Sequence, residues 1–263
     1  MGIAAIIAED WHAALAALAW QVEAGADEII LDAPVNRYEL AAEAPKPLSA
    51  KASSPAALPA ASGGADPVAV AKEVAEQAQT LGALQAALTD FDHCDLKKGA
   101  RNTVFSDGNP QARVLILGEA PGAEEDREGR PFVGRAGQLL DRMFAAIGLS
   151  RSSADADSAL YITNVMPWRP PGNRDPEPAE IAMMLPFVER HIALVDPKVI
   201  VVVGNTPLFA LTGAKGILRA RGTWTQALGK PLLPMAHPAY LLRNPSAKRE
   251  AWADLLSLRT RLR

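Results

Sequence analysis

The sequence predicts an α/β fold in which a parallel sheet carries helices on both faces. Four short apolar runs are typical of buried strands, at residues 114–117, 160–163, 199–203 and, more weakly, 231–235. Helical patterns lie between them, at residues 136–147, 178–193 and 206–212. Strands that alternate with helices at this spacing indicate parallel βαβ units.

A glycine-rich loop follows the first of these strands. Residues 118–134, GEAPGAEEDREGRPFVG, combine four glycines, several carboxylates and the aromatic Phe132. Because open α/β sheets bind ligands at the carboxyl ends of their strands, the loop predicts a pocket with an aromatic wall and an acidic lip. It contains neither GxxxxGK[ST] nor GxGxxG, and its carboxylates would repel a phosphate, so a nucleotide-phosphate site is not expected. The alternative is a glycine-rich turn with solvated acids.

Two further segments stand at equivalent places. The second strand runs into NVMPWRPPGNR at 164–174, and the fourth runs into AHPAYLLR at 236–243. The carboxyl ends of parallel strands meet at one edge of a sheet. An aromatic side chain, an asparagine and a histidine are therefore expected to converge there.

In this order the three segments resemble motifs of the uracil-DNA glycosylase superfamily, most closely those of its family 4. The resemblance covers about residues 84–256. It implies a three-layer α/β/α sandwich around a central four-stranded parallel sheet, and hydrolysis of the N-glycosidic bond of uracil in DNA. Since no lysine in the motifs is placed as a Schiff-base nucleophile, a monofunctional glycosylase is expected, which releases uracil and leaves an abasic site.

The resemblance, together with side-chain chemistry, assigns roles to three pocket residues. Asn164 offers an acceptor and a donor side by side, which match N3–H and O4 of uracil and mismatch cytosine. His237 would donate to O2 as the uracil anion forms, for which a neutral imidazole suffices. Phe132 would stack on the uracil ring. A turn-forming asparagine and a structural histidine are the alternatives.

Four more positions receive less specific roles. The Ala120 backbone N–H is a candidate oxyanion donor, and Glu119 would position water or stabilise the sugar cation. Glu125 and Asn173 match a family pair that braces the loops around the water.

The segment after His237 is expected to meet DNA. Leu241 or Leu242 would fill the space that the extruded base leaves. Arg243, Lys248 and Arg249 would contact phosphates. The alternative is an ordinary helix start with its leucines in the core, which is expected for one of the two.

One departure from the family pattern concerns a cofactor. Family 4 members hold an iron-sulfur cluster with four cysteines, and the matching positions here are Phe91, Cys94, Trp168 and Met184. One thiolate cannot hold a cluster. The sequence therefore predicts a cluster-free and metal-free branch in which apolar side chains fill the cluster's space.

The composition limits the cellular compartment and the partners that the sequence predicts. A single cysteine excludes a disulfide framework and favours a reducing cytoplasm. No apolar run approaches 18 residues, so no membrane span is expected. Residues 1–92 hold 4 basic and 13 acidic side chains, whereas residues 93–263 hold 23 and 17. The part that carries the motifs is therefore basic, which suits a DNA partner.

The amino-terminal third predicts its own organisation. Residues 1–32 form an extension with an amphipathic helix at 5–24, and the Ala/Pro-rich residues 33–66 have linker composition. The catalytic domain is expected at 67–263 and to begin with one helix at 67–89. The first helix would pack on the domain as a cap, dock a protein partner, or have no structured role. A monomer is favoured.

Two other functions are weighed against the enzyme. One is the superfamily branch that traps itself covalently on uracil-DNA through a histidine, but residues 169–175 contain none. The other is a catalytically degenerate module that binds uracil-DNA within a replication or repair complex.

Overall fold

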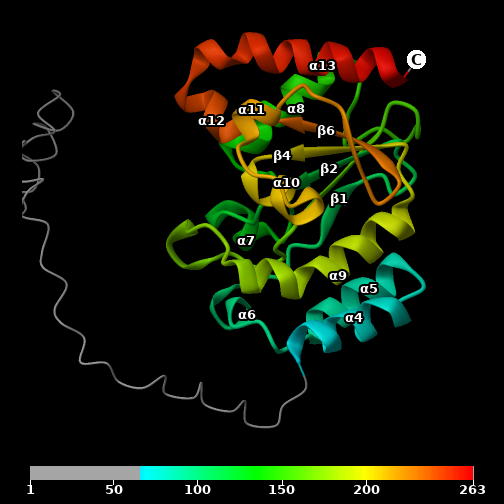
Figure 1. Cartoon of the computed structure of the whole chain (residues 1–263), viewed down its shortest axis with the longest axis vertical. Coiled ribbons are helices and arrows are strands. Elements are labelled where there is room, and N and C mark those ends of the chain that lie inside the picture. The colour runs from blue at the N-terminus through cyan, green and yellow to red at the C-terminus, as the bar shows by residue number, and fades with distance from the viewer. Residues whose placement is uncertain (1–65, 263) are drawn as a thin grey trace, which may run out of the picture. The chain divides into compact units, whose positions relative to one another are not determined.

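A computed structural model describes residues 66–262. The amino-terminal helix predicted at 5–24, and all of the predicted linker except Asp66, lie outside these residues. The described part is built on one six-stranded sheet with the order β1-β3-β2-β4-β6-β5 (Figure 1). Its strands are β1 (Ser106–Gly108), β2 (Val114–Gly118), β3 (Leu160–Asn164), β4 (Val199–Val203), β5 (Thr225–Ala227) and β6 (Lys230–Met235).

The four predicted strands are the four parallel strands at the centre of the sheet. β2 pairs in parallel with β3 and β4, and β4 pairs in parallel with β6. The predicted α/β class is therefore confirmed. The sheet also has two antiparallel edge strands that the sequence did not reveal, β1 on β3 and β5 on β6. Each has only three residues, too few for a period-two pattern to stand out.

Helices cover both faces of the sheet, which gives three layers (Figure 1). Alternate strand residues such as Ile116 and Val201 pack with α8 (Arg135–Ala145) and α13 (Lys248–Leu262). Their neighbours, such as Leu117 and Val202, pack on the opposite face with α9 (Pro178–Val195) and α10 (Asn205–Thr212). Strands buried on both faces explain why these runs are continuously apolar.

The helix predicted at 67–89 is two helices, so that prediction is wrong. α4 (Pro67–Gln77) and α5 (Leu81–Asp90) both pack on α9. Thr80 begins α5, because its hydroxyl accepts from the backbone N–H of Ala83 at 3.1 Å. The carbonyl of Ala78, in the break between the helices, accepts from Arg190 Nε at 2.7 Å. That contact comes from α9, so its effect was invisible in the local sequence.

Short helices complete the described part: α6 (Leu96–Gly99), α7 (Ala123–Glu128), η1 (Pro171–Asn173), α11 (Ile217–Ala220), α12 (Pro238–Arg243) and η2 (Pro245–Ala247). Several of them follow the carboxyl ends of parallel strands, where a pocket is expected. Within residues 66–262, no helix has both the length and the apolar character that crossing a membrane requires.

Candidate active site

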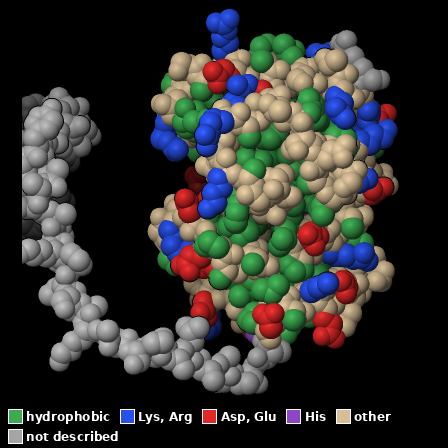
Figure 2. All heavy atoms as spheres, viewed as in Figure 1, with side chains coloured by type: hydrophobic (Ala, Val, Ile, Leu, Met, Phe, Trp, Pro, Cys, Tyr) green, Lys and Arg blue, Asp and Glu red, His purple; other side chains and the backbone are tan. Residues whose placement is uncertain are grey.

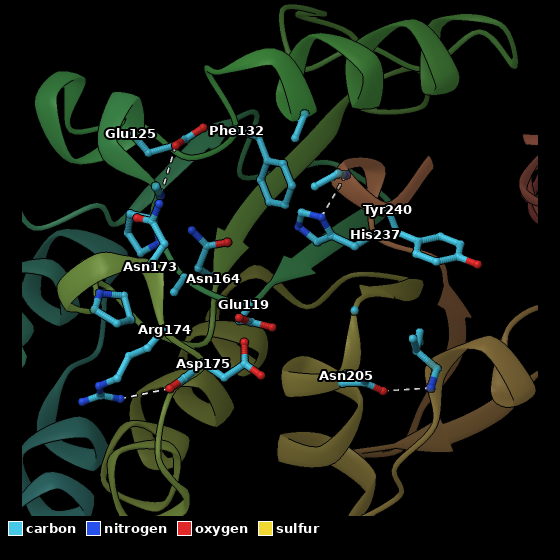
Figure 3. Close-up of a pocket in the computed structure, with 18 of the residues that line it drawn as sticks. Glu119, Glu125, Phe132, Asn164, Asn173, Arg174, Asp175, Asn205, His237 and Tyr240 are labelled. Carbon is cyan, nitrogen blue, oxygen red and sulfur yellow. Dashed lines mark hydrogen bonds between the residues drawn. The ribbon is translucent and has the colours of Figure 1, made fainter. Parts of the chain in front are cut away.

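A cavity of about 580 Å³ opens at the carboxyl edge of the parallel sheet. It is lined by the segments that follow β2, β3, β4 and β6, so all four parallel strands contribute to it. Its size falls within the range of ligand pockets, roughly 300–1,000 Å³. Figure 3 shows Phe132, Asn164 and His237 facing one another across this space. The three segments identified from sequence therefore meet at one site.

Phe132 is held as the wall of the cavity by close packing beneath it. Its backbone has a positive φ of 54°, and its side chain is 7% exposed. A Cβ at Gly118 would lie 2.5 Å from Phe132 Cε2 and 2.3 Å from Asn164 Oδ1. A Cβ at Gly137 would lie 1.8 Å from the Phe132 carbonyl oxygen. Glycine at these two positions is what lets the ring and the amide come together.

Arg151, which sequence reasoning missed, fastens the same loop from behind. Its guanidinium donates to the carbonyls of Pro131 at 2.8 Å and Phe132 at 2.9 Å. It also donates to Asp141 at 2.8 Å and Asp107 at 3.1 Å. These charge-assisted bonds satisfy the carbonyls of a strained turn. No local motif marks Arg151, because its partners are 10 to 44 positions away in the chain.

Asn164 lines the cavity and holds a buried polar atom that lacks a partner among the described residues. It ends β3, is 7% exposed, and its Oδ1 has no hydrogen-bond partner among the described residues. A buried acceptor without a donor costs roughly 1–3 kcal/mol, so a native structure that keeps one calls for an explanation. A ligand that enters the cavity and donates a hydrogen bond to Oδ1 would explain the unpaired acceptor.

His237 is neutral and has a defined tautomer. It precedes α12, and its Nδ1 accepts from the backbone N–H of Ala239 at 3.1 Å. The pKa of His237 is lowered to about 4, chiefly by burial and also by the positive charge of Arg243, whereas Glu125 acts in the opposite direction. A neutral imidazole that accepts at Nδ1 carries its proton on Nε2. The ring lies 5.7 Å from the Phe132 ring, centroid to centroid.

Glu119 is paired with a hydroxyl that the sequence did not single out. Thr206, near the start of α10 and 7% exposed, donates to Glu119 Oε2 at 2.7 Å. Burial raises the pKa of Glu119, the Thr206 bond lowers it, and the nearby Asp175 raises it. The two residues are 87 positions apart, so only the fold reveals the pair. Their bond fixes the direction in which the carboxylate points.

Glu125 braces the glycine-rich loop. Its carboxylate accepts from three backbone N–H groups, of Gly122 at 3.1 Å and of Val133 and Gly134 at 3.0 Å. Asn173 also lines the cavity, with a backbone φ of 55°, and its Oδ1 accepts from Arg169 Nε at 2.8 Å. Both side chains therefore hold loops at the cavity.

Of the six remaining predicted residues, two line the cavity and four do not. Ala120 and Arg243 line the cavity. Leu241 is fully buried beside Ala236 and Ala251, so it is the core leucine of the pair. Leu242 is partly exposed outside the cavity lining, and Lys248 and Arg249 begin α13 as exposed side chains that do not line it either.

Comparison with known proteins decides the family. A sequence model of the uracil DNA glycosylase superfamily matches residues 105–256. The chain belongs to the uracil DNA glycosylase superfamily. A type-4 uracil-DNA glycosylase of Thermotoga maritima is 43% identical over 156 residues, which are 58% of this chain and 78% of the relative. A type-4 enzyme of Sulfurisphaera tokodaii is 38% identical over 176 residues, covering 63% and 77%. The resemblance to family 4 is thus confirmed.

The positions that match the cluster cysteines of family 4 do not suit an iron-sulfur cluster. Phe91, Cys94, Trp168 and Met184 are all buried in one hydrophobic cluster between the sheet and α9. Trp168 donates from Nε1 to Thr103 at 3.1 Å, and Phe91 packs edge-on against Phe187. Burial raises the pKa of the Cys94 thiol, which disfavours the thiolate that a metal needs. Among residues 66–262, no three His, Cys, Asp or Glu side chains cluster as metal ligands would.

Proposed function

We propose that this chain is a monofunctional uracil-DNA glycosylase, which hydrolyses the bond between uracil and deoxyribose in DNA. The observation that carries the proposal is the buried amide of Asn164, a residue that lines the same cavity as Phe132 and His237 and whose Oδ1 lacks a partner among the described residues. Uracil offers the missing donor at N3–H and an acceptor at O4. Cytosine has an unprotonated N3 and an amino group, which would leave the buried amide unpaired.

The leaving group is stabilised by His237. As the bond between N1 of uracil and C1′ of the sugar breaks, negative charge develops on the base and positive charge on the sugar. The Nε2–H of a neutral His237 donates to uracil O2, and the Ala120 N–H is a further donor at the same edge. Stacking on Phe132 adds about 0.5–1.5 kcal/mol beyond burial.

The attacking water is assigned to Glu119. A water molecule adds its oxygen to C1′, one proton leaves it, and the uracil anion is protonated to give free uracil. The Glu119 carboxylate, oriented by Thr206, holds this water or stabilises the sugar cation. Glu125 and Asn173 keep the surrounding loops in place. The site is open to a base only when that base has left the stack.

Release of uracil from a single-uracil oligonucleotide tests this function. We expect an abasic product that stays intact under mild neutral conditions and breaks in hot alkali. Strand nicking without alkali would refute a monofunctional reaction. Tight binding of uracil-DNA without turnover, lost in Asn164→Ala, would instead support a degenerate binding module. A covalent complex that survives denaturation would support the self-trapping branch.

We further propose that the enzyme works without an iron-sulfur cluster, and that Phe91, Trp168 and Met184 fill its place. Three apolar side chains at the ligand positions support this. Determination of iron and acid-labile sulfide in the purified, active protein tests it. Stoichiometric iron and sulfide would overturn it. We propose that the enzyme acts as a monomer in the cytoplasm. Docking of a protein partner by residues 1–32 remains a prediction.

A further inference from the structure

The rim of the cavity holds an exposed apolar side chain that the glycosidic reaction does not use. Leu218 lines the cavity but is 50% exposed, whereas Asn164 and Phe132 lie buried further in. Of the two leucines that the sequence suggested as a wedge, Leu241 is 0% exposed and belongs to the core, and Leu242 does not line the cavity. We propose that Leu218 is the side chain that enters the DNA stack beside the extruded uracil. This inference rests on the proposed function.

The turn that carries Leu218 is anchored on both sides. Asn205 Oδ1 accepts from the backbone N–H of Gly216 at 3.2 Å and of Ile217 at 2.8 Å. Ile217 itself is buried, which fixes the start of α11. Beyond α11, Arg221 donates to Asp254 Oδ2 at 2.9 Å and to the Glu250 carbonyl at 2.7 Å. Leu218 is therefore held at the rim by the fold around it.

The charge around Leu218 fits a nucleic-acid partner. Residues 213–223, GAKGILRARGT, contain Lys215, Arg219 and Arg221 and no acidic side chain. Lys215 and Arg219 flank Leu218 in sequence, and Arg243 lines the same cavity. Across residues 213–263 there are ten Lys and Arg against two Asp and Glu. Figure 2 shows Lys and Arg side chains spread over the half of the viewed face that holds α11, α12 and α13.

Geometry then places the DNA. A uracil that reaches Asn164 and His237 must pass the rim, so its neighbours in the strand stay outside the cavity, beside α11 and α12. Basic side chains on both elements would contact the phosphates. An apolar side chain between them would occupy the space that the base vacates, which offsets the loss of stacking. Leu218 has the exposure, place and chemistry for this.

Such a wedge acts only where a stack must be opened, and this gives a specific test. Single-turnover excision is measured on a single-stranded oligonucleotide with one uracil and on the same strand paired opposite adenine. We expect Leu218→Ala to slow the duplex reaction about tenfold, because unstacking is part of that reaction, and to change the single-strand reaction less than about twofold. Leu218→Met, which retains the apolar bulk, should keep most of the duplex rate.

Leu228 provides the matched control. It is another exposed leucine (46%), but it lies in the turn between β5 and β6 and does not line the cavity. Leu228→Ala should leave both rates unchanged. An equal loss on both substrates in Leu218→Ala, or no loss at all, would overturn the wedge.

A second readout separates this inference from the proposed function. In duplex DNA with 2-aminopurine beside the uracil, wild-type binding should raise the fluorescence as the stack opens, and Leu218→Ala should raise it less. This signal needs no bond cleavage. If the wild-type protein opened the stack without releasing uracil, the glycosylase proposal would fail while the wedge remained. If Leu218→Ala opened it as fully as the wild type, the wedge would fail alone.

Discussion

The segment that follows β3 contributes residues to two regions with opposite properties, the cavity and the apolar cluster between the sheet and α9. Asn164 lines the cavity and its buried Oδ1 has no partner within residues 66–262, while Trp168, four residues later, is buried in the apolar cluster with its Nε1–H bonded to Thr103. The first arrangement costs folding free energy and is explained by a ligand. The second contributes folding free energy and is explained by packing. Substitutions in the two regions should therefore separate activity from stability.

The packed region should give the largest effect. Trp168→Ala leaves a cavity in the cluster, so we expect the free energy of unfolding to fall by about 3–5 kcal/mol. Denaturant unfolding followed by circular dichroism measures it. Trp168→Phe, which keeps an aromatic ring, should lose clearly less. An unchanged stability with lost excision would show that Trp168 belongs to the active site instead.

The reverse outcome is expected at His237. His237→Ala removes a donor that acts as the uracil anion forms, so single-turnover excision should slow roughly 10²–10³-fold. Thermal unfolding should change much less than in Trp168→Ala, because the variant loses the bond from the Ala239 N–H to Nδ1, worth about 0.5–2 kcal/mol, and no side chain of the apolar cluster. His93→Ala, at an exposed histidine away from the cavity, is the control and should leave excision unchanged. A His237→Ala variant with the full single-turnover rate would end the proposed mechanism.

Substitution of Asn164 tests directly whether the unpaired buried amide lowers stability while it serves excision. Asn164→Leu replaces an unpaired buried amide by an apolar side chain of similar size, so we expect equal or higher thermal stability. Excision should fall about 10–100-fold, since hydrogen bonds to a charged group are worth about 1.5–3 kcal/mol and the base gains charge as it leaves. A large loss of stability would mean that the amide supports the fold.

The smallest effect concerns pH. Glu119 acts as a carboxylate, and its pKa is raised by burial, so excision should decline as pH falls through that raised pKa. Thr206→Val removes the bond that lowers the pKa. The acid limb of the rate profile should therefore move to higher pH, with less than about tenfold loss at the optimum. Thr206→Ser keeps a hydroxyl at this position, so the acid limb should stay at the pH of the wild-type protein.

The expected contribution of His237 to this profile is different. Its pKa of about 4 lies below the raised pKa of Glu119, so the imidazole takes up its proton at a lower pH than the carboxylate does. The acid limb should therefore persist in His237→Ala at a reduced rate. A limb that disappeared in this variant would assign the titration to the histidine.

Local pattern was enough to predict the central sheet and most of the site. Each parallel strand is a continuous apolar run, because both of its faces are covered, and each run ends in the polar segment that lines the cavity. Strands that are parallel must bring those ends to one edge. For that reason the pocket positions of Phe132, Asn164 and His237 followed from the order of residues alone.

Other features depended on contacts between distant parts of the chain. β1 and β5 are strands only because β3 and β6 offer them an edge, and α4 and α5 separate where Arg190 reaches the Ala78 carbonyl. Thr206 orients Glu119 from 87 positions away. Leu218 and Leu241 are both leucines near a helix start, yet one is exposed at the rim and the other lies in the core. The sequence determined which residues meet at the sheet edge through its periodicity, whereas burial and pairing depend on what packs alongside, so only the tertiary structure decided them.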